Sequence, residues 1–497
     1  MTLPESLGEL YNLQTLKLAG CLNLTMLLVS MKDLVNLRHL DIRGTYLHEM
    51  PKGMNKLKKL QFLSTYVVGK HEDNKIKELG ALADLHKSIH IAKLENVVNS
   101  SEALDARMSD KDGIDTIALS WSPNEDENIV DFQLEKDILG MLRPHTNLKH
   151  LVIWGYRGTT YSSYHNITKI YLGGFFEDGF KNCCMLPTLG PLPSLNHLTI
   201  YKFERLEIVG AEFYQKDESC LETPFPMLET LSFESMPCWK EWHLKFHAFP
   251  RLKHLTICEC PMLRGDLPNQ LPSLQSLKIE NCEQLSYCLP RAPVMTSLSI
   301  QGGNEVRIGE LPPLLTDVSI KGNHQVESVL ETIMKVQLTC LKSLSILGCS
   351  SHISFPVSNI PASLQQLKIS DCRKLELQMD GQHHSLQELS IFRSCDSVTS
   401  FSLLDSFPNL KRVQITYCDN IESIVVSHSL QQLTIECCPK LENIEGEKLP
   451  VSLTQLVIYG SPLLGKRCEM KDPQVWPKFS HIPDIQVDRR RINNVNS

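Results

Sequence analysis

The sequence lacks any apolar run near the roughly 20 residues that a membrane-spanning helix needs, and its mean hydropathy is −0.15. Residues 1–6 carry neither a basic nor an apolar stretch, so they do not have the pattern of a secretory signal peptide. The net charge of −7 leaves no broad basic footprint for nucleic acid or an anionic membrane. These absences predict no membrane span, no nucleic-acid partner and residence in the cytoplasm, with the nucleus as the second compartment.

Motifs that carry catalysis or hold cofactors are also missing. The sequence has no H-E-x-x-H, no G-x-S-x-G and no G-x-G-x-x-G between a strand and a helix. Residues 460–467 (GSPLLGKR) come close to a phosphate-binding loop, but Arg467 stands where the loop needs a Ser or Thr to hold Mg²⁺. We therefore interpret this segment as a capping turn, and we expect no enzymatic activity, no cofactor and no small-molecule substrate.

The 17 cysteines favour neither a zinc site nor a disulfide framework. No C-x-x-C unit occurs, although cysteines are adjacent at 183–184 and 437–438. Most cysteines recur at one position of a repeated phrase, and equivalent positions of a repeat array lie in a row instead of facing one another. We expect reduced thiols that pack inward in a turn, where the weak S–H donor reaches a carbonyl oxygen, and no bound metal.

The dominant feature that is present is a nine-residue phrase, apolar-x-x-apolar-x-apolar-x-x-Cys, which returns along almost the whole chain. Its copies begin at Leu13, Leu252, Leu274, Leu341, Leu364, Leu410 and Leu430. A fixed phrase with a period of about 20–26 residues is typical of a leucine-rich-repeat solenoid, in which each unit packs only on its neighbours. The predicted fold class is an α/β solenoid. It is a horseshoe with a parallel β-sheet on the concave face and irregular loops and short helices on the convex face.

Each phrase predicts a short strand whose side chains alternate between the core and the concave face. In the copy at Leu252, the inward residues are apolar, and His254, Thr256 and Cys258 point outward. Tyr, Trp and Arg are enriched at binding hot spots, so aromatic and arginine residues at outward positions are the candidate partner-binding residues. They are Trp154, Tyr201, Phe392, Arg412, Tyr417 and Tyr459.

The regularity of the phrase divides the chain into four predicted segments. They are N-terminal repeats without a visible cap at 1–65, degenerate repeats with a helical insertion at 66–147, regular repeats at 148–460 and a C-terminal cap and tail at 461–497. The insertion predicts a helix over 100–111, opened by a Ser100 cap, and a second helix over 131–142. The tail is expected to fray at 489–491. Terminal repeats need a polar cap, and none is visible in the N-terminal repeats. We therefore expect this chain to be the C-terminal portion of something longer, either a fragment or a truncated gene product.

Four longer blocks stand beside the phrase: 3–16 (LPESLGELYNLQTL), 94–122 (with LENV and LSWS), 186–214 (from LPTLGPLPSL to VGAEFY) and 467–485 (ending in WPKFSHIPDI). Together they resemble the leucine-rich-repeat region of plant intracellular nucleotide-binding leucine-rich-repeat (NLR) disease resistance proteins of the coiled-coil class. The chain departs from the family in two respects. The coiled-coil and nucleotide-binding modules are absent, so ATP/ADP switching is not carried over. The family's Phe-Pro-x-Trp element is missing around 157–165.

The resemblance implies a non-enzymatic recognition module of plant innate immunity that acts in disease resistance and the defense response. Its partner would be a pathogen effector, or a host protein guarded against modification by an effector, bound through the concave face. The alternative is a truncated regulatory or decoy remnant that docks on the nucleotide-binding core of related full-length receptors. Binding to such a core without an effector would favour the alternative, and the sequence does not decide between the two.

Overall fold

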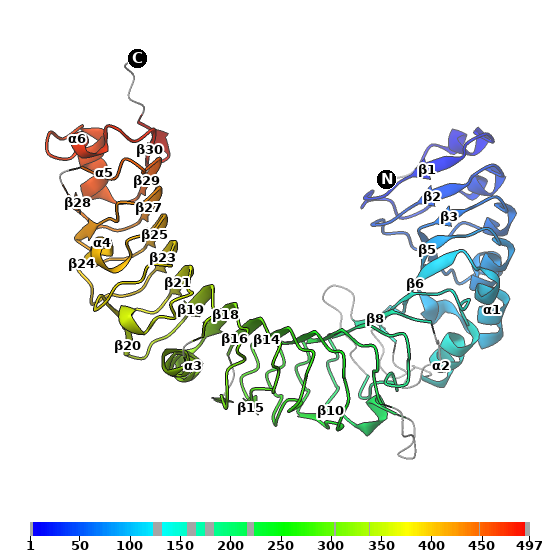
Figure 1. The fold of residues 1–497 in the computed structure, drawn as a ribbon. Coiled ribbons are helices and arrows are strands. Elements are labelled where there is room, and N and C mark those ends of the chain that lie inside the picture. The colour runs from blue at the N-terminus through cyan, green and yellow to red at the C-terminus, as the bar shows by residue number, and fades with distance from the viewer. Residues whose placement is uncertain are drawn as a thin grey trace. The chain divides into compact units, whose positions relative to one another are not determined.

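The computed structural model describes residues 3–122, 132–156, 166–173, 183–215, 223–302, 305–336, 338–446 and 448–492. The predicted departure at 157–165 lies outside these residues. The chain forms two compact units, residues 1–271 and 272–497, which are described in turn. In both units, the parallel strands of the main ladder follow one another in chain order (Figure 1).

Unit 1 contains two ladders of parallel strands. A short ladder joins β1 (Thr15–Lys17), β2 (His39–Asp41) and β3 (Phe62–Leu63). The main ladder joins β4 (Thr65–Val67), β5 (Lys87–Ala92), β6 (Ile114–Ser120), β7 (His150–Trp154), β8 (Lys169–Gly173), β9 (His197–Tyr201), β11 (Thr230–Glu234) and β13 (His254–Cys258). A small pair, β10 (Ile208–Val209) and β12 (Glu241–Trp242), forms a second row.

The helices of unit 1 are short. The 3-10 turns are Glu5–Glu9, Val29–Asp33, Met54–Lys56, Glu72–Asn74, Ile76–Ala81, Leu94–Asn96, Met108–Asp110 and Ala211–Phe213. Helix α2 (Phe132–Met141) confirms the second predicted helix. Helix α1 covers only Ser100–Asp105, and its cap is Asn99, whose side chain accepts a hydrogen bond from the Ser101 amide at 3.0 Å. The predicted Ser100 cap is therefore wrong by one residue, because Ser100 already has helical geometry.

Unit 2 repeats the same arrangement. Its main ladder joins β14 (Ser276–Glu280), β16 (Ser297–Gln301), β18 (Asp317–Lys321), β19 (Ser343–Leu347), β21 (Gln366–Ser370), β23 (Glu388–Phe392), β25 (Arg412–Thr416), β27 (Gln432–Glu436), β29 (Gln455–Tyr459) and β30 (Asp484–Val487). The second row holds the pairs β15 (Ser286–Cys288) with β17 (Glu305–Arg307), and β20 (Ile353–Pro356) with β22 (Leu375–Gln378). It also holds the trio β24 (Ser400–Ser402), β26 (Ser423–Val425) and β28 (Asn443–Glu445).

The helices of unit 2 are α3 (Asn323–Lys335), a 3-10 turn (Val357–Asn359), α4 (Leu403–Ser406), α5 (Pro462–Glu469) and α6 (Trp476–Phe479). Past α6, the sheet continues into β30 and then into β31 (Arg490–Arg491), which pairs with β30 in the antiparallel sense. The Arg491 side chain also donates to Asp484 at 2.8 Å. The prediction that the tail frays at 489–491 is therefore wrong for Arg490 and Arg491. Among the described residues, no helix has the length and apolar character that crossing a bilayer requires.

The phrase residues form the core as predicted. Leu252, Leu255 and Ile257 are at most 1% exposed, whereas the intervening His254 and Thr256 are exposed or half-buried. The same alternation recurs in β7, β9, β16, β19 and β23. These strands and their parallel pairing confirm the leucine-rich-repeat fold.

Six of the seven phrase cysteines lie buried in the turn after their strand, whereas Cys21 is half-buried. Cys260, Cys282, Cys349, Cys372, Cys418 and Cys438 are each at most 2% exposed. In most of them, the thiol contacts the carbonyl oxygen two residues earlier; for Cys372 the Sγ–O distance to Ser370 is 3.2 Å. Burial raises the pKa of the Cys372 thiol to about 11, so it stays protonated and able to donate. The predicted inward thiol with a carbonyl partner is confirmed.

The same position also links several repeats to the next. The amide of Cys349 donates to Cys372 Sγ at 3.4 Å, and the amide of Cys372 donates to Ser394 Oγ at 2.9 Å. Farther along, the amide of Cys438 donates to Ser461 Oγ at 3.0 Å. Ser394 and Ser461 therefore take the place of the cysteine in their repeats. Each of these sulfur or oxygen atoms supplies an acceptor to a buried amide of the preceding turn, which would otherwise be unpaired.

The residue before this cysteine or serine adopts a left-handed backbone conformation. Non-glycine residues hold it in several turns, with φ of 55° at Glu259, 53° at Asp371 and 54° at Tyr417. Glycine holds it elsewhere, with φ of 61° at Gly348 and 56° at Gly460. The conformation turns the chain so that the next side chain enters the core, and it costs a non-glycine residue about 1–2 kcal/mol.

Ser394→Ala should lower the free energy of unfolding by about 1–3 kcal/mol, because the buried amide of Cys372 would lose its acceptor. Ser394→Cys should cost clearly less, since a cysteine at this position accepts the equivalent bond in the neighbouring repeat. Urea unfolding of the two variants and the parent chain measures the difference. Equal losses for alanine and cysteine would show that the turn bond does not stabilise the array.

Gly348→Val should lower the free energy of unfolding by about 1–2 kcal/mol, and Gly348→Asn by less, because asparagine tolerates positive φ better than a β-branched residue. A Cβ atom at this position would meet only the Lys321 side chain, at 3.6 Å, which is an ordinary contact. The loss therefore reports backbone strain and not a clash. Denaturant midpoints for both variants test the order, and an asparagine variant as unstable as the valine variant would contradict it.

Candidate partner-binding face

One face of each sheet displays the alternate strand residues that point away from the core; we call it the open face. In β9, His197, Thr199 and Tyr201 are half-buried on this face, while Leu198 and Ile200 are fully buried. Neighbouring strands are parallel and paired residue by residue. The first, third and fifth residues of successive strands therefore form three rows along the open face within each unit.

In unit 1, Trp154 and Tyr201 lie on the open face at the ends of β7 and β9, as predicted, and both are half-buried. The structure adds Tyr171 on the intervening strand β8, whose ring centroid lies 6.4 Å from that of Tyr201. A Cβ on Gly173 would lie 2.5 Å from Tyr171 Cε1, so the glycine provides the space for this ring. Trp154, Tyr171 and Tyr201 form what we call the unit 1 aromatic patch.

The histidine His90 supports the patch from β5. Its ring meets Trp154 edge to face, with ring centroids 5.0 Å apart, and its Nε2 lies 2.9 Å from Ser120 Oγ. Burial lowers the pKa of His90 to about 4. The imidazole is therefore neutral at physiological pH and holds the indole in place as an uncharged partner.

In unit 2, the structure brings together Phe392, the last residue of β23, and Tyr417. The prediction of an outward strand position is wrong for Tyr417, because β25 ends at Thr416 and Tyr417 lies in the turn that follows. The two ring centroids are 5.5 Å apart in an edge-to-face arrangement. The guanidinium of Arg393 lies 4.9 Å from the Phe392 ring and pairs with Asp371 at 3.1 Å. Tyr417 is 47% exposed. Its ring contacts Phe392, and Phe392 in turn contacts Arg393. This cluster presents an ordered aromatic side chain to solvent.

The remaining two candidates of unit 2 are Arg412 and Tyr459. Arg412 is the first residue of β25, so it stands at the opposite end of the strand from Tyr417, and it pairs with Glu388 at 2.9 Å. Tyr459 ends β29, is 38% exposed and lies under the guanidinium of Arg489, 5.2 Å from its ring centroid. Two of the six predicted residues thus lie in unit 1 and four in unit 2, where Phe392 and Tyr417 are in ring contact.

The open face of unit 1 also carries a row of histidines that the sequence reasoning missed. His150, His197 and His254 are the first residues of β7, β9 and β13, and Lys169 holds the same position on β8. The signal was present as a histidine at one fixed place in the phrases at 148, 195 and 252. Tyr171 was also missed, although it stands at the outward position between Ile170 and Leu172 in the phrase that begins at Ile167.

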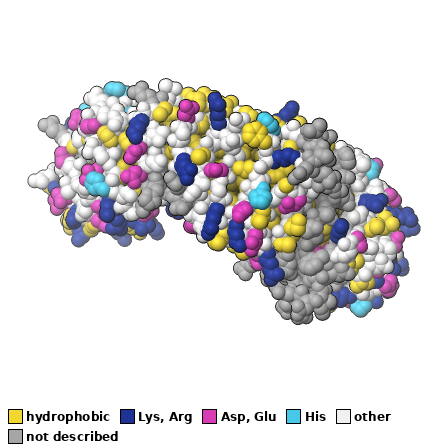
Figure 2. All heavy atoms as spheres, turned by 90° about the horizontal axis from the view of Figure 1, so that it is seen from below, with side chains coloured by type: hydrophobic (Ala, Val, Ile, Leu, Met, Phe, Trp, Pro, Cys, Tyr) yellow, Lys and Arg dark blue, Asp and Glu magenta, His cyan; other side chains and the backbone are white. Residues whose placement is uncertain are grey.

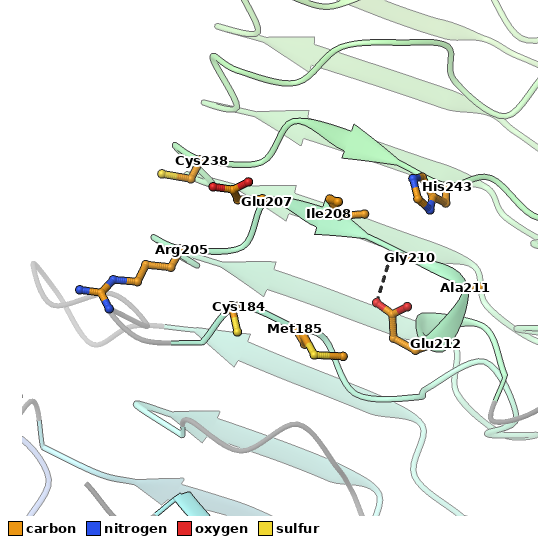
Figure 3. Close-up of a pocket in the computed structure, with 10 residues that line it drawn as sticks. All are labelled: Cys184, Met185, Arg205, Glu207, Ile208, Gly210, Ala211, Glu212, Cys238 and His243. Atoms are coloured by element: carbon orange, nitrogen blue, oxygen red, sulfur yellow. Dashed lines mark hydrogen bonds between the residues drawn. The ribbon is translucent and has the colours of Figure 1, made fainter. Parts of the chain in front are cut away.

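A shallow depression of about 740 Å³ lies elsewhere in unit 1, beside β10 and β12 (Figure 3). Its residues come from 184–243 and include Cys184, Met185 and Ile208, with Glu207 paired to Lys240 at 2.9 Å. Seen from below, hydrophobic side chains of the molecule alternate with positive and negative ones (Figure 2). Within the described part of the chain, no group of His, Cys, Asp or Glu residues could hold a metal ion.

Comparison with known proteins gives consistent relatives. Residues 76–203 match the family model of the R13L1/DRL21 leucine-rich repeats. An Arabidopsis thaliana protein named as disease resistance protein At3g14460 is 31% identical over 91% of this chain, and RPP13-like protein 1 of the same plant, also named for disease resistance, is 34% identical over 63%. The chain spans only 39% and 30% of their lengths. The solved circular leucine-rich-repeat protein CroV588 aligns over 90% of this chain and 63% of its own, at 14% identity and a TM-score of 0.39.

His90→Gln should make the chain less sensitive to acid. Between pH 6.5 and about 4, the unfolded chain binds a proton at His90 that the folded chain does not bind, so stability falls as the pH falls through this window. The glutamine variant should lose roughly 1–2 kcal/mol less than the parent chain between pH 7 and 5. Urea unfolding at both pH values measures this, with the exposed His428→Gln as control. A variant with the parent's full acid loss would contradict the assignment.

Proposed function

Since this chain belongs to the leucine-rich-repeat family of plant disease resistance proteins, we propose that it is a recognition module of plant innate immunity. It binds a pathogen effector, or a host protein altered by one, through the open face of its repeats. The relatives named for disease resistance support the role in plant immunity. The choice of a protein as the ligand rests on the residues of the open face.

The observation that carries the proposal is a set of ordered aromatic and arginine side chains on the open face and, for Tyr417, in the turn at its edge. Their rings are held by neighbours: Trp154 by His90, Tyr201 by Tyr171, and Tyr417 by Phe392. A side chain that is already ordered loses little conformational entropy when a partner binds, so more of its contact energy appears as affinity. Tyr, Trp and Arg are also the residues most enriched at hot spots.

Recognition is favoured over catalysis by the form of the face. Catalysis needs titratable groups that converge in a pocket from which water can be excluded. The open face instead spreads its side chains in rows over successive strands, which suits an extended protein surface. The described cysteines are free and most phrase thiols are buried, as expected in a reducing compartment. We therefore place the chain in the cytoplasm or nucleus as part of this proposal.

Trp154→Ala, Tyr201→Ala and Tyr417→Ala should each weaken partner binding about 10-fold or more, because truncation of a hot-spot residue costs at least about 1–2 kcal/mol. The partner is first identified by co-purification from pathogen-challenged leaf tissue and then produced in pure form. Affinities are measured by calorimetry. Tyr46→Ala is the matched control, since Tyr46 is 68% exposed and lies outside the strands.

Normal affinity in all three variants would overturn the assignment of binding to the open face. The same experiment separates the rival hypothesis. A chain that binds the nucleotide-binding core of a related resistance protein, in the absence of any effector, would act as a regulatory or decoy protein. Denaturation curves for each variant show whether a loss of affinity comes from a loss of folding.

A further inference from the structure

The first residues of three successive strands in unit 1 form a compact row of basic side chains. His150 on β7 pairs with Lys169 on β8, and Lys169 pairs with His197 on β9. We call these three residues the histidine–lysine row. His150 and His197 are half-buried, and Lys169 is exposed. Strands in a sheet are about 4.8 Å apart, so the two imidazoles are separated by roughly 10 Å, too far to share a metal ion.

The charged groups around the row nearly cancel one another. His150 faces Asp115 and Lys149 in addition to Lys169, and its ring lies 3.3 Å from the Thr116 hydroxyl. On the other side, His197 faces Glu229, and Glu229 is paired with Lys253 at 2.8 Å.

The electrostatic surroundings of His197 also include His254 and His150. When both imidazoles are neutral, Lys169 carries the positive charge of the row. Protonation of His150 and His197 would add two further positive charges.

The environment of the row keeps both imidazoles mostly neutral in the free protein. Burial, and then the neighbouring Lys169, lower the pKa of His150 and of His197 below its ordinary value. A carboxylate placed against the row would act in the opposite direction, since an opposite charge within about 4–6 Å favours the protonated form. An anionic partner would therefore draw protons onto the row as it binds.

The row shares its three strands with the unit 1 aromatic patch. Trp154 and Tyr201 are the last residues of β7 and β9, four residues from His150 and His197, which corresponds to roughly 13 Å along the strand. A polypeptide segment lying across the open face can reach both. Its apolar residues would contact the rings, and its acidic residues would meet the row.

We propose that the histidine–lysine row receives the carboxylates of an acidic segment of the protein partner, and that protons are taken up as this segment binds. The inference rests on the proposed function, because it specifies the partner's chemistry at the same face. Charge complementarity supports an acidic polypeptide over nucleic acid. Lys169 and, once protonated, His150 and His197 supply up to three positive charges to a segment that carries carboxylates, whereas a phosphate backbone requires many more cations than these.

The test uses the purified full chain and two fluorescein-labelled ten-residue peptides at 0.15 M salt. One peptide alternates Glu with Leu, and the other alternates Gln with Leu. Fluorescence anisotropy should show that the Glu peptide binds about 10-fold or more tightly at pH 6.0 than at pH 7.5, because at least one proton is taken up while the carboxylates remain ionised. The Gln peptide should bind equally at the two pH values.

Variants assign the effect to the row. The double variant His150→Gln/His197→Gln should abolish the pH dependence, and Lys169→Gln should weaken Glu-peptide binding at both pH values. His428→Gln, an exposed histidine of unit 2, should behave as the parent chain does. Denaturation curves confirm that each variant is folded.

Four results would overturn the inference: no binding of the Glu peptide, equal binding of the Glu and Gln peptides, a pH dependence that survives the double variant, or tighter binding of a single-stranded oligonucleotide than of the Glu peptide. Its failure is distinguishable from failure of the proposed function. A natural partner that needs Trp154 and Tyr201 but binds independently of pH would contradict the inference and leave the proposed function intact. Proton-linked binding of the Glu peptide, with a natural partner indifferent to the open face, would sink the proposed function alone.

Discussion

The array depends on how each turn satisfies its buried backbone amide. A solenoid needs a sharp turn after every strand, and the turn leaves an N–H group inside the core with no strand to pair with. In several turns, a sulfur or hydroxyl oxygen of the following repeat accepts this hydrogen bond, as Cys372 does for Cys349 and Ser394 does for Cys372. The side chain that supplies the acceptor is itself buried among leucines, so one residue both fills the core and ties two repeats together.

Much of the fold could be predicted because the spacing of residues within the phrase determines which side chains are buried. Apolar residues spaced for one face of a strand predicted the main ladders, and the cysteine predicted the inward turn. The left-handed residue before the cysteine was not predictable in the same way, since Glu259, Asp371 and Tyr417 have little in common chemically. The second row of short strands also gave no signal, because its pairing depends on how neighbouring repeats stack and not on any local pattern.

The sequence predicted which strand residues point outward on the open face, but not which of their side chains contact one another. Outward-pointing residues follow from alternation along a strand, and this placed Trp154 and Tyr201 correctly. Whether two rings touch depends on the register between repeats, as for Phe392 and Tyr417, which are 25 positions apart in sequence. Tyr171 stands at an outward position of the phrase that begins at Ile167 and was missed, and its ring orientation depends on the missing side chain of Gly173.

The left-handed turn residue affects how the surface of the repeats can change during evolution. It lies at the border between core and surface, so its side chain can be exchanged without disturbing the packed leucines. Tyr417 shows the position occupied by a large ring, while Gly348 and Gly460 leave it empty. At Gly348, where an added Cβ would meet only the Lys321 side chain, one mutation can introduce new chemistry at a modest cost in backbone strain. The repeat array thereby carries a reserve of sites for diversification that the core does not constrain.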